Sequence, residues 1–190
     1  MDKKRCAWCK KDPLYVAYHD KEWGVPIYDD KLLFEFLILE GMQAGLSWFT
    51  ILKKRDAFRT AFSNFNARKI SQFDQNKIDL LLNNADIIRN KLKITAAVEN
   101  AKAFLKIKNE RDSFSAYIWH FVDGQPIQNH WNNIKQVPVK TSISDTMSKD
   151  LKQRGFKFVG STICYAFMQA VGMVNDHTVD CFKYKELKKS

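Results

Sequence analysis

The sequence predicts a single all-α domain, and three observations support that prediction. Apolar residues recur at helical spacing in several stretches, and most of these stretches follow a residue that can cap a helix. No stretch makes a convincing strand, and no repeat or low-complexity tract interrupts the chain. The chain has 190 residues, of which 45% are hydrophobic, so it can build a substantial core. We therefore expect a single domain over residues 1–190.

The first 28 residues are irregular and rich in aromatic side chains. Pro13, Gly24 and Pro26 interrupt this segment, so we expect no more than a short helix over residues 14–19. The segment holds too many aromatic residues for a mobile tail. It either packs against the rest of the domain or forms part of a functional site.

A buried helix is expected next, over residues 32–39. Asp29 or Asp30 can cap it, and apolar residues occupy nearly all of its sides. Glu40 is expected to end this helix, and Gly41 follows directly. Burial and the negative end of the helix dipole both oppose a carboxylate at this position. Glu40 therefore belongs to a site, or else backbone N–H groups or a basic side chain satisfy it.

The middle of the chain predicts more helices, over residues 48–62, 78–84, 87–105 and 115–121. Residues 122–140 are polar and contain one glycine and two prolines, which is typical of a surface loop. The last residues, 183–190, are charged, and we expect them to be frayed.

A helix, a tight turn and a second helix are predicted over residues 145–177. The first helix ends near Gly155, which suits a left-handed helix stop. Gly160 can take a positive φ or admit another backbone, and Ser161 or the next residue can cap the second helix. A helix N-terminus binds anions and Lys157 lies in the turn, so the pattern suits a DNA phosphate. An ordinary helical hairpin with a solvated basic face fits it about equally well.

The charge balance bears on the partner and the compartment. Lysine and arginine number 31 against 21 aspartate and glutamate residues, which gives a net charge of +10. This excess favours a polyanion, nucleic acid before a membrane surface, although solubility alone would also explain it. No apolar run is long enough to span a bilayer, and no apolar core follows the N-terminus. We expect a cytoplasmic protein whose four cysteines do not form disulfides.

Cysteine and histidine residues at the two ends of the chain predict a possible metal site. His177 and Cys181 are four residues apart, which places them on one helix face or around one turn. Cys6 and His19 are the candidates from the other end, with Cys9 as a rival. Two thiolates and two imidazoles suit a closed, tetrahedral, structural zinc site. Buried cysteines and hydrogen-bonded histidines are the alternative interpretation.

Aromatic residues around Glu40 predict a second site. A carboxylate inside an aromatic box suits a flat ring that is electron-poor or cationic. The box would draw on Trp8, Tyr15, Tyr18, Trp23 and Trp48. A purely structural aromatic core, with Glu40 satisfied inside it, is the alternative.

Together these stretches resemble the DNA-3-methyladenine glycosylase I family, which repairs alkylated DNA in bacteria. The resemblance covers nearly the whole chain. It rests on long motifs: Arg5-Cys6-Ala7-Trp8, Asp12-Pro13-Leu14-Tyr15, Tyr18-His19-Asp20, Glu22-Trp23-Gly24-Val25-Pro26, Leu39-Glu40-Gly41-Met42-Gln43-Ala44-Gly45-Leu46-Ser47-Trp48, Arg154-Gly155-Phe156-Lys157-Phe158-Val159-Gly160 and Asn175-Asp176-His177. It implies a two-lobed helix-hairpin-helix fold and hydrolysis of the N-glycosidic bond of 3-methyladenine in double-stranded DNA by a monomer.

The resemblance also implies roles for individual residues. Zinc would be held by Cys6, His19, His177 and Cys181, without Cys9. Met42 departs from the family pattern, where we expect a second glutamine. Glu40 would accept hydrogen bonds from the base and favour its positive charge, and four aromatic residues would bind or enclose it: Tyr18, Trp48, Trp8 and Tyr15. Residues at two loops would contact DNA: Gln43 and Leu46 in the gap left by the base, and Lys157, Gly160 and Ser161 at a phosphate.

Two further expectations concern the reaction. Asp176 stands near the place where many related glycosylases carry an aspartate that stabilises the oxocarbenium ion, but the adjacent His177 is committed to zinc in this resemblance. We therefore assign no catalytic role to Asp176. We identify no lysine nucleophile, which predicts a monofunctional enzyme rather than a lyase. A non-catalytic DNA-binding module that keeps the hairpin and the zinc is the alternative function.

Overall fold

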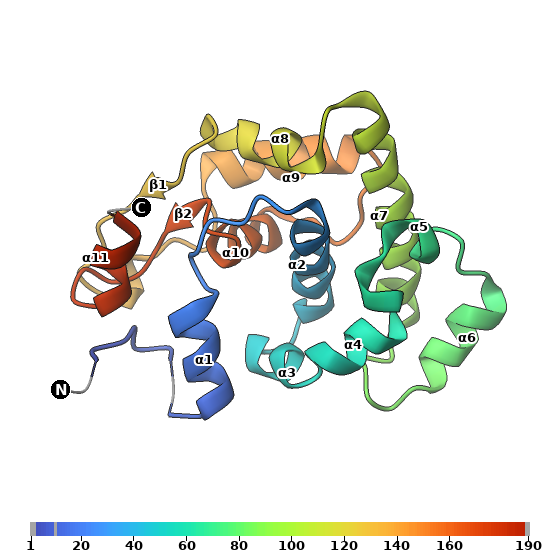
Figure 1. The fold of residues 1–190 in the computed structure, drawn as a ribbon, viewed down its shortest axis with the longest axis horizontal. Coiled ribbons are helices and arrows are strands. Elements are labelled where there is room, and N and C mark those ends of the chain that lie inside the picture. Colours follow the sequence, from blue (N-terminus) through green and yellow to red (C-terminus); the bar gives the residue numbers. More distant parts are fainter. Residues whose placement is uncertain (1–2, 10, 189–190) are drawn as a thin grey trace.

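Helices make up most of the domain in the computed structural model, which describes residues 3–9 and 11–188 (Figure 1). The α-helices are α1 Pro13–Lys21, α2 Asp30–Gln43, α3 Trp48–Lys53, α4 Arg55–Ala61, α5 Ala67–Ile70, α6 Gln75–Asn83, α7 Lys91–Glu110, α8 Phe114–Trp119, α9 Ser142–Gln153, α10 Ser161–Ala170 and α11 Phe182–Lys188. Three short 3₁₀ helices join them: η1 Ser63–Phe65, η2 His120–Val122 and η3 Ile134–Gln136.

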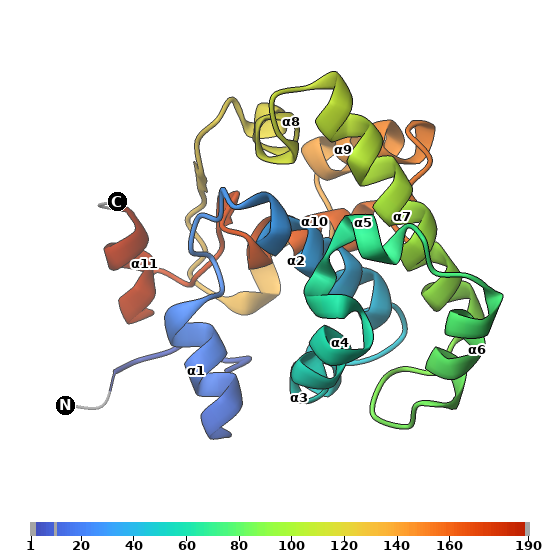
Figure 2. The same ribbon diagram turned by 45° about the vertical axis from the view of Figure 1, so that its right-hand side comes forward.

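Helix α2 is the central element of the domain. Its residues from Leu33 to Met42 are all buried, and it packs against α10 and against α7. Helices α1 and α11 lie at one end of the molecule and α6 at the other, in both views (Figures 1 and 2). No helix in the described part of the chain is long and apolar enough to cross a lipid bilayer.

Two short strands modify the expected all-α fold. Strand β1, Ile127–Gln128, pairs in parallel with β2, Val174–Asn175, and Trp131 forms one isolated bridge farther along. The segment 122–140, expected to be a loop, therefore runs beside the chain that follows α10. Strands of two residues are too short to produce a period in the sequence, so pattern analysis could not detect them.

The boundaries of several helices differ from expectation. Helix α2 continues through Glu40 to Gln43, so Gly41 lies inside it rather than after it. A Cβ on Gly41 would lie 3.4 Å from Cβ of Phe158, so the hairpin packs directly against this part of α2. The stretch 48–62 divides at Lys54 into α3 and α4.

Helix α7 and the C-terminal helix also differ from expectation. Helix α7 begins at Lys91, where Asn90 caps it, and runs five residues beyond the expected end at position 105. The charged tail, expected to be frayed, forms α11 through Lys188, while residues 189–190 lie outside the described part.

The predicted helix, turn and helix are present as α9, a hairpin over residues 154–160, and α10. Thr141 caps α9, and Gly155 takes φ +95°, the left-handed conformation expected of it. Gly160 instead has φ −62°, and Phe158 adopts the positive φ of +53°. Gly160 is also the N-cap of α10 and offers no side chain. The expected cap by Ser161 is therefore wrong, because Ser161 is the first helical residue and its Oγ lies 2.8 Å from Oγ of Ser144.

Candidate active site and metal centre

A cavity of about 190 Å³ lies beside Glu40. Its walls come from the N-terminal segment, α1, α2, the start of α3, α10 and the segment that follows β1. It is lined by Trp8, Tyr15, Tyr18, Trp23, Glu40, Gln43, Trp48, Ile134, Val137, Ala166 and Gln169. The structure thus brings together every residue proposed for the aromatic box. The last four lining residues, two of them from the supposed loop, carried no signal in the sequence.

Three buried polar atoms in this cavity have no hydrogen-bond partner: Oε2 of Glu40, Nε1 of Trp8 and Nε1 of Trp48. Native proteins satisfy nearly all buried polar groups, so three such atoms around one small space indicate a ligand that satisfies them. The alternative in which Glu40 is an ordinary satisfied core residue does not account for its free oxygen.

Burial raises the pKa of Glu40 to about 8. The Tyr18 hydroxyl is fully enclosed, and burial together with the nearby Glu40 carboxyl holds its pKa well above the ordinary value. Near neutral pH, Glu40 is therefore largely protonated and Tyr18 is neutral when no ligand is bound. A cationic ring placed beside Glu40 would favour the carboxylate form, because opposite charges attract strongly in a dry site.

The aromatic walls support one another. The rings of Trp8 and Tyr15 are 5.1 Å apart, and Trp8 meets Trp23 edge-on at 4.9 Å. The rings of Tyr18 and Trp48 are tilted at 5.3 Å. Such contacts hold each ring in a fixed orientation, so the cavity is formed before a ligand enters it.

Cys6, His19, His177 and Cys181 meet in a buried cluster, as the resemblance implies. Their candidate ligand atoms all lie within 4.8 Å of one another. Sγ of Cys6 is 3.4 Å from Nδ1 of His177, and Sγ of Cys181 is 3.5 Å from Nδ1 of His177 and from Nε2 of His19. A tetrahedral zinc ion at ordinary bond lengths separates sulfur from nitrogen by roughly 3.6 Å. The cluster therefore has the size and donor set that zinc requires.

The other ring nitrogen of each histidine is also engaged. Nδ1 of His19 lies 2.8 Å from Oδ1 of Asp20, and Nε2 of His177 lies 3.0 Å from the carbonyl oxygen of Trp23. Metal-binding histidines usually donate their second nitrogen to a carboxylate or a backbone carbonyl in this way. Arg5 in turn binds Asp20 with two nitrogens. Cys9 is outside the cluster, with its Sγ 3.9 Å from the carbonyl oxygen of Tyr15.

The two cysteines of the cluster are unequal. A hydrogen bond with Cys181, followed by burial, raises the pKa of Cys6, and the same hydrogen bond lowers the pKa of Cys181. Metal ligation needs both thiolates, so a divalent cation bound here would displace the thiol protons.

The residues expected to contact DNA lie outside the cavity, with one exception. Gln43 lines the cavity at its α2 edge, whereas Leu46 is 42% exposed on the turn that follows. Lys157, Gly160 and Ser161 lie on the hairpin and at the start of α10. Because Gly160 caps α10 without a side chain, the first N–H groups of that helix remain available to an anion.

Asp176 is buried and fully engaged. Its Oδ1 accepts hydrogen bonds from Asn129 and Trp131 at 2.7 Å, and its Oδ2 accepts from Tyr165 and Gln169 at 2.7 and 2.8 Å. Four donors leave this carboxylate no capacity for a substrate. The geometry agrees with the expectation that Asp176 is not catalytic.

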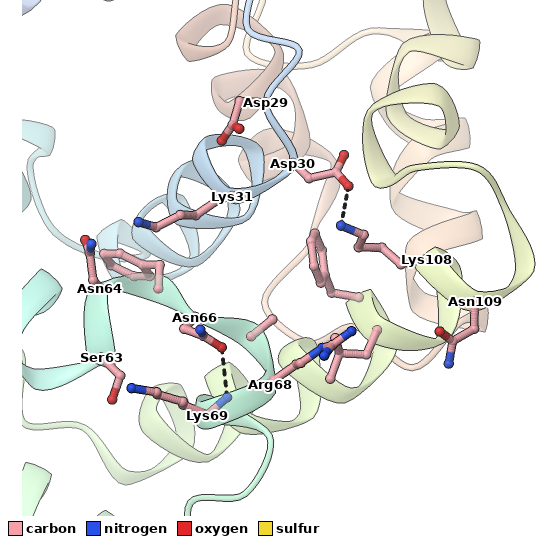
Figure 3. A pocket seen from close by; sticks show the side chains of 14 residues that line it. Asp29, Asp30, Lys31, Ser63, Asn64, Asn66, Arg68, Lys69, Lys108 and Asn109 are labelled. Atoms are coloured by element: carbon pink, nitrogen blue, oxygen red, sulfur yellow. Dashed lines mark hydrogen bonds and ion pairs between the residues drawn. The ribbon is translucent and has the colours of Figure 1, made fainter.

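A larger hollow, of about 900 Å³, lies between the start of α2, η1 with α5, and the C-terminal half of α7 (Figure 3). Three of its polar side chains are engaged within the protein: Asp30 pairs with Lys108 at 2.8 Å, and Asn66 caps α5. None of the unpartnered buried atoms found in the described chain belongs to it. The small cavity beside Glu40 is therefore the better candidate for chemistry.

Known proteins share this whole architecture. The family model for methyladenine glycosylase matches residues 8–184. DNA-3-methyladenine glycosylase 1 of Escherichia coli (strain K12) is 49% identical over 95% of this chain and 97% of its own. The DNA-3-methyladenine glycosylase of Haemophilus influenzae is 48% identical, over 93% and 96%.

Solved structures give the same result. A crystal structure of a 3-methyladenine DNA glycosylase I superposes with a TM-score of 0.93 at 50% identity, covering 94% of this chain and 98% of that one. A Staphylococcus aureus 3-methyladenine DNA glycosylase I, solved for the structural basis of 3-methyladenine recognition, has a TM-score of 0.92 at 39% identity over 95% and 96%. The chain therefore belongs to the methyladenine glycosylase family, as its motifs predict.

Proposed function

We propose that this protein is a monofunctional DNA glycosylase that hydrolyses the N-glycosidic bond of 3-methyladenine in double-stranded DNA. The observation that supports it best is the unpartnered carboxylate oxygen of Glu40 inside a preformed aromatic cavity. The relatives of the chain are named for the same base, and one solved neighbour is in complex with 3-methyladenine.

Base recognition follows from the cavity. Methylation makes the adenine ring cationic, and Glu40 meets that charge while accepting hydrogen bonds from the base edge. Tyr18 hydrogen-bonds the base, and Trp8, Tyr15 and Trp48 enclose its faces. An unmodified adenine brings no charge, so it lacks the charge attraction to ionised Glu40. This difference gives the discrimination, because ring stacking alone is similar for both bases.

The reaction needs little help from an acid. The bond between the sugar carbon C1′ and the base breaks, and its electron pair neutralises the cationic ring. Water forms the new bond to C1′ and releases a proton. No lysine is among the described residues that line the cavity, which supports hydrolysis over a lyase reaction.

DNA binding is assigned to two loops. The α9, hairpin and α10 unit acts as a helix-hairpin-helix that holds a phosphate with Lys157, Gly160 and Ser161. Gln43 and Leu46, at the end of α2, fill the gap that the extruded nucleotide leaves. The protein binds as a monomer, in the cytoplasm, where duplex DNA is its partner. Basic side chains near the hairpin make the affinity depend on salt.

A structural zinc ion is assigned to Cys6, His19, His177 and Cys181. The donor set, the separations and the outer hydrogen bonds fit it. Its contribution is to folding: it would join the N-terminal segment, which carries Trp8, to the chain that follows β2.

The cavity beside Glu40 distinguishes the enzyme from a non-catalytic DNA-binding module. A binding module would need the hairpin and the zinc. It would not need a preformed cavity that contains a carboxyl oxygen without a hydrogen bond. The family to which the chain belongs also favours the enzyme.

The test is to incubate the protein with methylated duplex DNA and to identify the released bases by chromatography. We expect free 3-methyladenine, with 7-methylguanine left in the DNA. Borohydride should trap no covalent complex. A folded, DNA-binding protein that releases no base would leave only the binding module.

A further inference from the structure

Two buried polar side chains on α7 take no part in the cavity. Lys93 and Asn100 are 8% and 3% exposed. They are seven residues apart, about two helical turns, so they project from the same side of the helix. Burying an ammonium or a carboxamide is unfavourable unless it is hydrogen-bonded. The partners of these two side chains therefore indicate what each one does.

Lys93 holds the end of α2. Its Nζ donates hydrogen bonds to the carbonyl oxygens of Met42, at 2.9 Å, and Ala44, at 2.5 Å. A cation is favourable at this end of a helix, where the carbonyl groups lack helical partners. Gln43 lies between the two bonded residues, and Leu46 follows on the same turn. Lys93 thus fixes the loop assigned to the gap in the duplex.

Asn100 holds the hairpin. Its Oδ1 accepts from the backbone N–H of Lys157 at 2.7 Å, and its Nδ2 donates to the carbonyl oxygen of Lys157 at 3.0 Å. The carboxamide thus pairs with the backbone as a neighbouring strand would. The next residue, Phe158, has φ +53°, a conformation that a residue with a side chain adopts only when its surroundings enforce it. The two hydrogen bonds between Asn100 and the preceding residue help to hold Phe158 in this conformation.

The three elements meet at one place. Gly41 of α2 faces Phe158 of the hairpin, and Ala96 and Ala97 of α7 line the same narrow space as Lys93 and Asn100. A Cβ on Gly41 would lie 3.4 Å from Cβ of Phe158, which is van der Waals contact, so α2 and the hairpin pack directly against each other here. A shift of either loop would therefore be opposed by α7 and by the other loop.

We infer that Lys93 and Asn100 are positioning residues that hold the two DNA-contacting loops at a fixed separation. The hairpin can then hold a phosphate while the turn after α2 reaches the gap in the same stretch of duplex. Neither side chain needs to touch DNA. The inference rests on the proposed function, since it takes both loops to be DNA-contacting.

The experiment uses Lys93→Met and Asn100→Leu, which keep the size of each side chain and remove its hydrogen bonds. Lys102→Met is the matched control, because Lys102 is exposed on α7 and pairs only with Glu99 in the structure. Two affinities are measured: for a short unmethylated duplex, and for free 3-methyladenine by tryptophan fluorescence. We expect duplex affinity to fall about tenfold in each test variant, while free-base affinity stays within about twofold. The control should change neither.

Two more readouts separate positioning from general stability. If the two side chains hold one shared geometry, the double variant should lose less duplex affinity than the product of the single losses. Asn100→Leu should also reduce the slope of log affinity against log salt concentration, by up to about the amount that one phosphate contact contributes. The reason is that Lys157 would no longer be held at the phosphate. Lys93→Arg keeps a cation and donors for both carbonyls, so it should restore most of the affinity. A merely structural role predicts neither the coupling nor the change of slope.

Two results would overturn the inference. One is wild-type duplex affinity in folded Lys93→Met and Asn100→Leu. The other is an equal loss of duplex and free-base affinity, which would place the effect in the cavity or in general stability. Should Asn100→Leu not fold, Asn100→Ala carries the same test, since it removes both hydrogen bonds and adds neither bulk nor charge. Failure of the proposed function is distinguishable, because duplex affinity is measured without base release.

Discussion

Glu35 and Glu40 lie five residues apart on α2 and are each 2% exposed, yet only Glu35 is neutralised. Arg55 donates to Oε1 of Glu35 at 2.7 Å, and Arg59 reaches the same oxygen at 2.9 Å. Among the residues that the structure describes, Glu40 has no basic partner, and its Oε2 has no hydrogen bond. The helix thus carries one carboxylate that supports the fold and one that weakens it, which makes the two a natural pair for mutagenesis.

The first prediction concerns Glu40→Gln. We expect excision of 3-methyladenine to fall on the order of 10²-fold, because the neutral side chain cannot favour the cationic base. Stability near pH 7 should rise by as much as roughly 3 kcal/mol, because wild-type Glu40 must take up a proton when folding buries it and the variant need not. Single-turnover excision and chemical denaturation measure the two effects.

Glu35→Gln is the matched control. It removes the carboxylate that Arg55 and Arg59 share and leaves buried Arg55 with Glu22 as its ion-pair partner, so it should destabilise the protein by about 2 kcal/mol. Excision by the fraction that remains folded should change little. Equal activity of Glu40→Gln and wild type would remove Glu40 from the mechanism.

The second prediction is a pH dependence set by Glu40. Folding raises the pKa of Glu40 from 4.5 to about 8, so the folded state binds more protons between these values. The stability this gives is fully present below pH 4.5 and is lost as pH rises through 8. The stability advantage of Glu40→Gln over wild type should therefore grow across this window. Tm measured for both proteins at intervals of pH tests it, and a constant difference would contradict it.

Catalysis should follow the opposite course. If ionised Glu40 favours the cationic base, kcat/KM of the wild type should rise with pH toward a plateau above about 8, since kcat/KM reports groups of the free enzyme. Glu40→Gln should lack that rise. A wild-type profile that is flat between pH 6 and 9 would show that the carboxylate is not titrating in the free enzyme.

The third prediction concerns metal. Purified protein should contain one equivalent of zinc by elemental analysis, and Cys181→Ser should contain almost none. Loss of the metal should lower Tm by about 10 °C or more, because metal binding contributes directly to folding. Cys9→Ser is the control: Cys9 lies outside the cluster, so its zinc content should be unchanged. Equal zinc loss in both variants would contradict the ligand assignment.

The fourth prediction concerns Asp176→Asn. An amide replaces one of the two oxygens, so its NH₂ group must face either Asn129 and Trp131 or Tyr165 and Gln169, all of which donate to Asp176 in the wild type. We expect a loss of stability on the order of 3 kcal/mol. At low temperature, where the variant is folded, single-turnover excision should stay within about tenfold of wild type. A loss above 10³-fold in folded protein would instead indicate that Asp176 stabilises the transition state.

Much of the site could be predicted from the sequence because its residue types are unusual for their surroundings. Two features can be recognised from the sequence alone. One is Glu40 in an apolar helix, and the other is the set of cysteines and histidines in a chain that is expected to form no disulfides. The family that these motifs predict is confirmed by the comparisons. The zinc ion and the individual DNA contacts stay predictions.

What could not be predicted depends on contacts distant in sequence. Gly41 appears to local rules as a helix stop, but its neighbour Phe158 is more than a hundred residues away, and packing there keeps the glycine inside α2. Besides Gly155, Phe158 rather than Gly160 has a positive φ in the hairpin, next to the residue whose backbone Asn100 binds across 57 positions of sequence. Ile134 and Val137 line the cavity only because β1 pairs with β2.

The metal cluster joins residue 6 to residue 181, so nearly the whole chain lies between its first and last ligand. The N-terminal segment that supplies Trp8 to the cavity leaves the ribosome before α2 does, whereas His177 and Cys181, two of the four residues that would tether it, follow α10. During synthesis the helices from α2 to α10 can pack while one wall of the cavity is still unanchored. The wall that carries Trp8 can therefore be anchored only after all of α2 to α10 has been made.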